Sequence, residues 1–226
     1  MSRFGNCGSL ILLAVMLSPS WGATAQHPAP ETPAEYARML EDPSRDVWQK
    51  PDQVVAALHL TPTDVVADIG AGSGYFTRRI APHAAEVLAV DINPELLAIV
   101  GQRSPKNVRT VLATPDDPKL PLRSVDVIFF CDVLHHIRNR PAYFNKLRRA
   151  LKPNGRVVVV DFYKKDMPVG PPASMKLAET EVTGEFRAAG FRVSRSLDFL
   201  KYQYFLVFRY RGRGMGLGNW FPVHAD

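Results

Sequence analysis

The segment from Val65 to Thr77 constrains the fold of this chain more than any other part of the sequence. It consists of a short apolar run, an acidic residue, three glycines at alternate positions and the first residues of an expected helix. Glycine lets the backbone turn tightly and lets a ligand approach without meeting a Cβ atom. Because open α/β sheets bind ligands at the carboxyl ends of their strands, the segment predicts a strand–turn–helix unit with a ligand at its turn.

A second apolar run covers residues 86–91 and ends in Asp91. An acid at the tip of the second strand, about 20 residues after a Gly-rich turn, suits a ribose, because one carboxylate can accept hydrogen bonds from both hydroxyls. The sequence therefore predicts a nucleoside ligand, either a dinucleotide or a nucleoside that carries no diphosphate.

The spacing of the glycines decides between these two ligands. A dinucleotide site has the pattern G-x-G-x-x-G and places the pyrophosphate on a helix N-terminus. Here Gly70, Gly72 and Gly74 alternate and are followed by two bulky aromatic residues. Asp68 would also repel a pyrophosphate, whereas it would favour an ammonium or sulfonium charge. S-adenosyl-L-methionine carries both of these charges and a ribose.

With these residues the chain resembles the class I S-adenosylmethionine-dependent methyltransferases. Residues 68–74 resemble the first motif of that family, and Asp91 resembles the acid after its second strand. Residues 150–157 are similar to the L-K-P-G-G-x stretch of small-molecule methyltransferases, and the quinone-biosynthesis group is the most similar type. The resemblance covers roughly residues 50–210. It implies S-adenosylmethionine as cofactor and in-line transfer of its methyl group to a small-molecule acceptor, with quinone-like or phenolic compounds as the first guess by analogy.

The resemblance also assigns site residues. Those expected to bind the cofactor are Asp68, Gly70, Ala71, Gly72, Gly74, Asp91, Ile92, Asp116 and Asp132. Within this set Asp91 would hold the ribose, Ile92 would pack on the adenine, and Asp116, or else Asp117, would bind the adenine amino group.

Fewer residues of the sequence indicate where the methyl acceptor would bind. His136 and His135 follow the fourth expected strand and are the candidate catalytic residues, since imidazole titrates near neutral pH; capping of the following turn is the structural alternative. Asp161 and Tyr163 are expected to face the acceptor pocket. Tyr36 and Trp48, in a helical extension ahead of the first strand, are candidate lid residues.

The remaining pattern predicts an α/β fold, namely a Rossmann-like doubly wound, mostly parallel seven-stranded sheet that ends in an antiparallel hairpin. Near-continuous apolar runs such as Val157 to Val160 are typical of strands that are covered on both faces. The expected strands lie near residues 64–69, 86–91, 108–112, 125–131, 156–162, 191–197 and 202–210. The expected helices lie near residues 35–41, 51–59, 74–82, 94–102, 140–151 and 174–189.

The first 25 residues have the composition of a secretory signal peptide. Arg3 precedes an apolar run at residues 9–17, and small residues end at Ala25, after which cleavage is expected. The sequence thus predicts export to the periplasm, with membrane contact only through this segment; an uncleaved anchor or a cytoplasmic protein stays open. The expected organisation has four parts: signal peptide 1–25, Pro-rich linker and helical extension 26–50, methyltransferase domain 51–210, and Gly-rich tail 211–226.

Charge and cysteine content limit the other possible partners. The net charge of +6 comes from scattered Lys and Arg residues, which is typical of solvated surface, so no nucleic-acid partner is expected. Only Cys131 would remain after removal of a signal peptide that contains Cys7, so neither an internal disulfide nor a thiolate metal site is expected.

Two other functions remain open from sequence alone. The first is a nicotinamide-dependent oxidoreductase or epimerase on a Rossmann-like sheet, against which the glycine spacing and Asp68 argue. The second is an exported, non-catalytic nucleoside-binding module that keeps the same fold.

Overall fold

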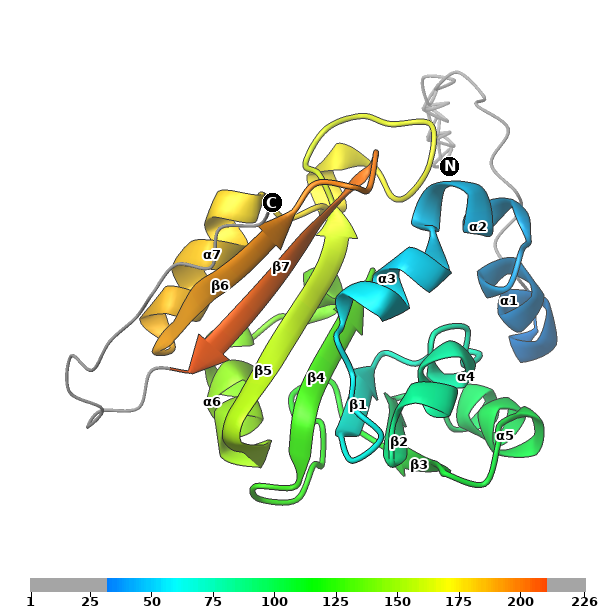
Figure 1. Cartoon of the computed structure of the whole chain (residues 1–226). Coiled ribbons are helices and arrows are strands. Elements are labelled where there is room, and N and C mark those ends of the chain that lie inside the picture. Colours follow the sequence, from blue (N-terminus) through cyan, green and yellow to red (C-terminus); the bar gives the residue numbers. More distant parts are fainter. Residues whose placement is uncertain (1–31, 211–226) are drawn as a thin grey trace, which may run out of the picture.

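The computed structural model describes residues 32–210, which form one seven-stranded sheet with helices on both faces (Figure 1). The strand order across the sheet is β3-β2-β1-β4-β5-β7-β6. The strands are β1 (Val65–Ile69), β2 (Glu86–Asp91), β3 (Val108–Leu112), β4 (Val125–Cys131), β5 (Leu151–Phe162), β6 (Phe191–Leu197) and β7 (Gln203–Tyr210).

The first five strands run parallel, and the last two form an antiparallel pair. β1 pairs in parallel with both β2 and β4, whereas β7 runs antiparallel to both β5 and β6. The chain order therefore reverses between β1 and β4, and this reversal is where open α/β sheets bind ligands. The predicted fold class is confirmed, including the C-terminal hairpin.

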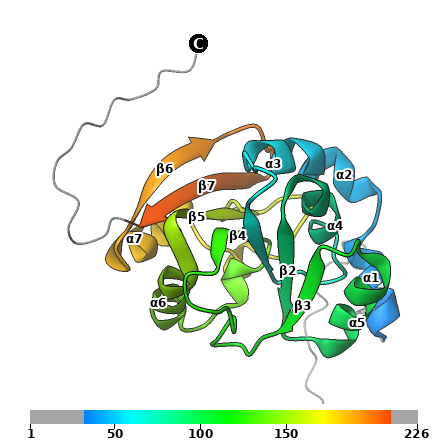
Figure 2. The ribbon, with the colours of Figure 1, turned by 60° about the horizontal axis from the view of Figure 1, so that its bottom comes forward.

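Helices cover both faces of the sheet. α6 and α7 lie together on one face, and α3 lies on the other (Figure 1, Figure 2). The helices are α1 (Pro33–Leu40), α2 (Ser44–Gln49), α3 (Pro51–Ala57), α4 (Thr77–Ile80), α5 (Pro94–Arg103), α6 (Arg140–Ala150) and α7 (Glu179–Ala188). Short 3-10 turns are η1 (Ala81–His83), η2 (Leu134–His136) and η3 (Ala173–Met175).

The core explains why the central strands are apolar along their whole length. Val157 to Val160 in β5 are fully buried, since alternate residues pack against the helices of opposite faces. On the α6–α7 face, the ring of Phe186 stacks between those of Phe144 and Phe208, at centroid distances of 4.0 and 4.1 Å. This rigid sheet fixes the strand ends at which the site is built.

Several expected boundaries differ from the structure. The expected helix 74–82 shortens to α4, because the backbone of the glycine turn continues to Phe76. β5 begins at Leu151, because Leu151 pairs with Val125 before the strand register shifts.

Two further helices also differ from expectation. α7 begins only at residue 179, because residues 163–178 form a proline-containing loop with one 3-10 turn. α2 has no counterpart among the helices expected from the sequence. Together α1, α2 and α3 cover most of residues 33–57, with breaks between them.

The expected signal peptide, the first part of the linker and the Gly-rich tail lie outside the described residues. Within residues 32–210, no helix is long and apolar enough to cross a membrane.

Candidate functional site

A cavity of about 460 Å³ opens at the carboxyl ends of β1, β2 and β4. This volume is within the range of small-molecule and cofactor pockets. Its walls come from the glycine turn after β1, the tips of β2 and β4, the loop after β3, and residues of α1 and α2. The cavity therefore lies at the predicted edge of the sheet.

The glycine turn brings the backbone directly to the cavity wall. Gly70, Ala71 and Gly72 line the cavity, and the two glycines have φ values of +72° and +55°. A Cβ atom on Gly70 would lie 2.3 Å from Cγ2 of Val133, and one on Gly72 would lie 2.9 Å from Cδ1 of Leu40. The turn thus needs glycine both for its left-handed backbone and for the close approach of its neighbours.

The third glycine has a different role from the one expected. Gly74 is not among the cavity residues. A Cβ atom there would lie 2.7 Å from Nη1 of Arg78 and 3.2 Å from Cγ2 of Val100 in α5. Gly74 therefore allows α5 and the start of α4 to pack closely, and no contact between Gly74 and a ligand follows from its position.

Replacing Gly70 by alanine is expected to destabilise the protein. The left-handed backbone alone costs an L-residue about 1–2 kcal/mol, and the overlap with Val133 adds to this. Gly101→Ala is the matched control, because a Cβ at this helical position meets nothing within 4 Å and should be neutral or stabilising. Urea unfolding of both variants measures the difference; equal free energies of unfolding would contradict the tight turn.

Asp91 lies at the tip of β2 with its carboxylate held by backbone groups. Its Oδ2 accepts a hydrogen bond of 2.8 Å from the Gly72 N–H, and its Oδ1 accepts one of 2.9 Å from the Asn93 N–H. Each carboxylate oxygen can accept a further hydrogen bond, so the group can receive two hydroxyls. Beside it, Ile92 lines the cavity with an apolar side chain that is 56% exposed.

Asp68 lines the cavity but is only 3% exposed. Its Oδ2 accepts a hydrogen bond of 2.6 Å from the hydroxyl of Thr77. Burial raises the pKa of Asp68 to about 6, and this effect outweighs the opposing hydrogen bond from Thr77. A cation in the cavity would stabilise the ionised form of this carboxyl.

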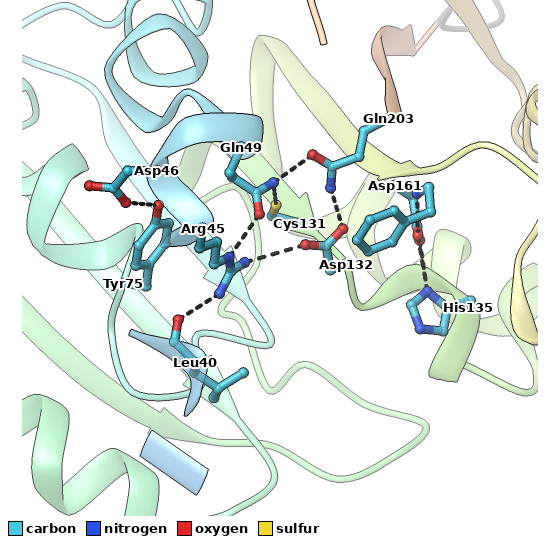
Figure 3. A network of polar contacts seen from close by, with 11 residues as sticks. Leu40, Arg45, Asp46, Gln49, Tyr75, Cys131, Asp132, His135, Asp161 and Gln203 are labelled. Carbon is cyan, nitrogen blue, oxygen red and sulfur yellow. Dashed lines mark hydrogen bonds and ion pairs between the residues drawn. The ribbon is translucent and has the colours of Figure 1, made fainter. Parts of the chain in front are cut away.

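Asp132 closes the tip of β4 in a left-handed conformation, with φ of +58°. Its Oδ2 lies 3.3 Å from Nη2 of Arg45, and its Oδ1 accepts a hydrogen bond from Nε2 of Gln203 (Figure 3). Burial raises the pKa of Asp132 to about 6 even though Arg45 acts in the opposite direction. The cavity therefore has two carboxyls, at the ends of β1 and β4, that are poorly solvated.

Arg45 also lines the cavity, although it was not among the residues expected at the site. Its Nη1 donates to the Leu40 carbonyl and its Nε donates to Oε1 of Gln49, both at 2.8 Å. Its guanidinium lies 4.3 Å from the centre of the Tyr75 ring. The only sequence signal was its place in the N-terminal extension, because its partner Asp132 is 87 residues away.

Gln49 extends the hydrogen bonds of Arg45 toward β4 and β7. Its Nε2 donates to Oε1 of Gln203 at 2.8 Å and lies 3.1 Å from Sγ of Cys131 (Figure 3). α2 is thereby joined to the ends of β4 and β7. Burial raises the pKa of the Cys131 thiol well above its usual value, so the reactive thiolate form is disfavoured.

The two candidate lid residues have different positions. Tyr36 of α1 lines the cavity and is 37% exposed. Trp48 of α2 is not a cavity residue, and its ring packs against that of Phe162 with a centroid distance of 5.6 Å. Tyr36 is therefore placed to cover a ligand, whereas Trp48 fastens the extension to β5.

The two histidines of η2 also differ. His136 lines the cavity. The side chain of His135 is 4% exposed and lies outside the cavity, with Nδ1 3.0 Å from Oδ1 of the fully buried Asp161. Asp161 therefore faces His135, and of the two candidate catalytic residues only His136 can meet a ligand in this cavity.

The two acids of the loop after β3 do not line the cavity, contrary to expectation. Asp116 is exposed, and its Oδ1 accepts a hydrogen bond of 2.8 Å from the Thr114 hydroxyl. Asp117 pairs with Lys119 and Lys146. A turn closed by backbone hydrogen bonds between Thr114 and Asp117 points both carboxylates away, so the cavity wall is formed by residues 113–115.

Comparison with known proteins agrees with this geometry. Residues 67–159 match the model of a family described as a methyltransferase domain. The structure resembles that of a SAM-dependent methyltransferase from Aquifex aeolicus, with a TM-score of 0.71, 26% identity, and coverage of 78% of this chain and 97% of that one. The chain therefore contains a methyltransferase domain of the class I S-adenosylmethionine-dependent type.

Curated relatives extend the likeness of this methyltransferase domain. A demethylmenaquinone methyltransferase of Tropheryma whipplei is 36% identical over 107 residues, which cover 46% of this chain and 44% of the relative. A probable S-adenosylmethionine-dependent methyltransferase of Mycobacterium tuberculosis is 31% identical over 153 residues, which cover 64% of this chain and 55% of the relative. The chain thus spans about half the length of these relatives. The predicted family is confirmed, and S-adenosylmethionine is the cofactor that defines it.

The cavity of this methyltransferase domain fits that cofactor. Ser73 lines it with a buried hydroxyl that has no hydrogen-bond partner within the described part of the chain. Asp91 has unused acceptor capacity, and Gly70 and Gly72 expose their backbone to the cavity without a side chain. By contrast, within residues 32–210 no group of three or more His, Cys, Asp or Glu side chains could hold a metal ion.

Proposed function

We propose that this protein transfers the methyl group of S-adenosylmethionine to a small-molecule acceptor by in-line displacement. The observation that carries the proposal is one cavity with acids at separate strand tips. Asp91 can take a ribose, and Asp68 and Asp132 can face positive charge. When bound, the cofactor supplies a sulfonium-activated methyl group, so the protein must mainly bind, align and exclude water.

The chain's own residues divide this task. Asp91 would accept both ribose hydroxyls while Ile92 offers an apolar surface to the adenine ring. Arg45 uses three of its five N–H groups on Leu40, Gln49 and Asp132, so two N–H groups are left for the carboxylate of the methionine part. Tyr36 of α1 would cover the bound cofactor and limit the access of water.

The acceptor is proposed on chemical grounds and by analogy. The cavity is lined mainly by apolar and aromatic residues, which suits a flat apolar compound. The relative from Tropheryma whipplei is named for methylation of demethylmenaquinone, and one from Cellvibrio japonicus is named as a biotin biosynthesis protein. Quinone-like or phenolic compounds are therefore the first acceptors to test. A match to a probable ribosomal RNA methyltransferase covers only 23% of this chain, so nucleic acid is the less favoured acceptor.

Calorimetric titration of the full chain with S-adenosylhomocysteine tests the proposal. We expect saturable binding of one molecule per chain, and no comparable binding of NAD. Binding of NAD in its place would revive the nicotinamide-dependent alternative. Binding of S-adenosylhomocysteine without methyl transfer to a broad acceptor panel would favour a non-catalytic nucleoside-binding module.

The affinity for S-adenosylmethionine should depend on pH more strongly than the affinity for the demethylated product, S-adenosylhomocysteine. Asp68 and Asp132 both have a pKa of about 6, so both lose their negative charge as the pH falls through that value. Only S-adenosylmethionine carries a sulfonium charge that gains from these carboxylates. Its affinity should therefore fall relative to that of S-adenosylhomocysteine between about pH 7.5 and about pH 5.

Asp68→Asn is the variant that checks this prediction. It keeps the shape of the side chain and removes one of the two titrating charges, so the pH dependence of the affinity ratio should become shallower. An affinity ratio that does not change with pH in the unmodified protein would mean that neither carboxyl faces the sulfonium.

Export also remains a proposal. The segment 1–25 lies outside the described residues, and its composition is the only support for cleavage after Ala25. N-terminal sequencing of protein recovered from the cell envelope and from the cytoplasm measures this directly. A new terminus at Gln26 supports export, and an intact Met1 in the cytoplasm contradicts it.

A further inference from the structure

A buried ion pair lies beside the cavity wall. Nδ1 of His135 is 3.0 Å from Oδ1 and 3.1 Å from Oδ2 of Asp161 (Figure 3). The two side chains are 4% and 0% exposed. Oδ1 of Asp161 also accepts a hydrogen bond of 2.8 Å from the Phe162 N–H. A carboxylate this deeply buried requires compensation of its charge, and His135 is the side chain hydrogen-bonded to it.

The groups around His135 favour its protonated form. Asp161 on β5 and Asp132 at the end of β4 both act to raise the pKa of His135, whereas Lys176, after η3, acts to lower it. The Nζ of Lys176 donates to the Lys165 carbonyl at 2.8 Å. Burial of His135 opposes the charge, but its hydrogen bond to Asp161 and the charge of that residue outweigh burial, so the pKa of His135 is raised.

The neighbouring imidazole is in the opposite situation. The ring centroid of His136 lies 4.2 Å from that of His135, and His136 lines the cavity. Two cations at this separation repel each other, so a proton on His135 disfavours a second proton on His136. Burial and the charge of His135 lower the pKa of His136, and the more weakly acting Asp161 opposes them. His135 thus holds a proton, and the neutral His136 can accept one.

We propose that His136 is the general base of methyl transfer, and that the buried His135–Asp161 pair is a positioning device that keeps it unprotonated. This inference rests on the proposed function and narrows its substrate class. The acceptor has to give up a proton, so it is a hydroxyl compound such as a phenol or quinol, or an activated carbon acid. An acceptor without such a proton, for example a thioether, would need no base.

The step balances in atoms and electrons. The acceptor oxygen or carbon forms a bond to the methyl carbon while the bond between methyl and sulfur breaks, and that electron pair stays on sulfur. The acceptor proton passes to a ring nitrogen of His136, which becomes cationic. His136 then returns the proton to solvent, a release that the adjacent charge on His135 favours.

Histidine NMR of the full chain tests the device without any acceptor. The protein is labelled with ¹⁵N-histidine and titrated, and the two signals are assigned from His135→Gln and His136→Gln, with exposed His83→Gln as the matched control. We expect the midpoint of His135 above about 6.5, the value of an unperturbed histidine, and that of His136 below it. Asp161→Asn should lower the midpoint of His135 and raise that of His136.

Two results would overturn the inference. One is a midpoint of His136 that equals or exceeds that of His135, and the other is an Asp161→Asn variant that moves neither midpoint. If Asp161→Asn does not fold, His135→Gln replaces it, because removal of this cation should likewise raise the midpoint of His136. A His136 midpoint that is unchanged in His135→Gln contradicts the coupling.

Activity provides the second readout. With a phenolic acceptor, His136→Gln should lower the rate of methyl transfer by about 10²–10⁴-fold and leave the affinity for S-adenosylhomocysteine unchanged. Undiminished transfer in this variant would refute the role of His136 as base. Failure of the proposed function itself is distinguishable, since it would appear as absent binding of S-adenosylhomocysteine whatever the histidine midpoints are.

Discussion

Asp91→Ala is expected to weaken the binding of S-adenosylhomocysteine by about 1–3 kcal/mol, or roughly 5- to 150-fold in affinity. The carboxylate is held by the N–H groups of Gly72 and Asn93, so its remaining lone pairs are fixed in direction before a ligand arrives. Alanine removes both acceptors of the ribose hydroxyls and leaves those hydroxyls unpaired in a partly closed cavity. Calorimetric titration of the variant measures the loss.

Asp116→Ala is the matched control for this experiment. Asp116 was the sequence-based candidate for the adenine amino group, yet its carboxylate is exposed and lies outside the cavity wall. Its removal should leave the affinity for S-adenosylhomocysteine unchanged. If Asp116→Ala weakens binding as much as Asp91→Ala does, the assignment of the adenosine to the tip of β2 is wrong.

Arg45→Ala is expected to lower the free energy of unfolding by about 3 kcal/mol. The side chains of Arg45 and Asp132 are only 15% and 17% exposed, so loss of the cation leaves a poorly solvated carboxyl without its charged partner. The same change also removes the hydrogen bond to the Leu40 carbonyl, which joins α2 to α1, and the one to Gln49 within α2. Urea unfolding at neutral pH measures the loss.

A double variant separates the charge from the packing. Arg45→Ala combined with Asp132→Asn should cost less than the sum of the single changes, because the amide needs no counter-charge. Arg38→Ala is the control, since Arg38 is 76% exposed and lies 4.0 Å from Glu35 in a surface pair, and it should change stability by less than about 0.5 kcal/mol. Additive costs at positions 45 and 132 would show that the ion pair contributes nothing.

Local patterns predicted most of the sheet because its strands are buried on both faces. β3 and β4 have the expected bounds, and β7 and β6 form the expected hairpin. The helix that was expected near residue 174 begins only at residue 179, because Lys176 is buried and its Nζ reaches back to the Lys165 carbonyl. Such a contact is formed by the folded chain and leaves no periodic signal in the sequence.

The residues of the site likewise include some that sequence patterns predict and others that depend on contacts of the folded chain. Asp68, Asp91 and Asp132 could be expected at the cavity because each lies at the end of a strand or next to it, and strand ends follow from the sheet topology. Arg45 could not, because its place depends on how a short helix folds back over the sheet edge. Asp116 was misplaced because a tight turn, and not the strand before it, sets the direction of its side chain.

A crystal structure of the protein with S-adenosylhomocysteine would show directly where the adenosine binds. We expect the ribose hydroxyls within hydrogen-bond distance of Asp91, the adenine beside Ile92, and the amino-acid end near Asp68 and Arg45. A nucleoside bound elsewhere on the molecule, with these side chains free of contact, would contradict it.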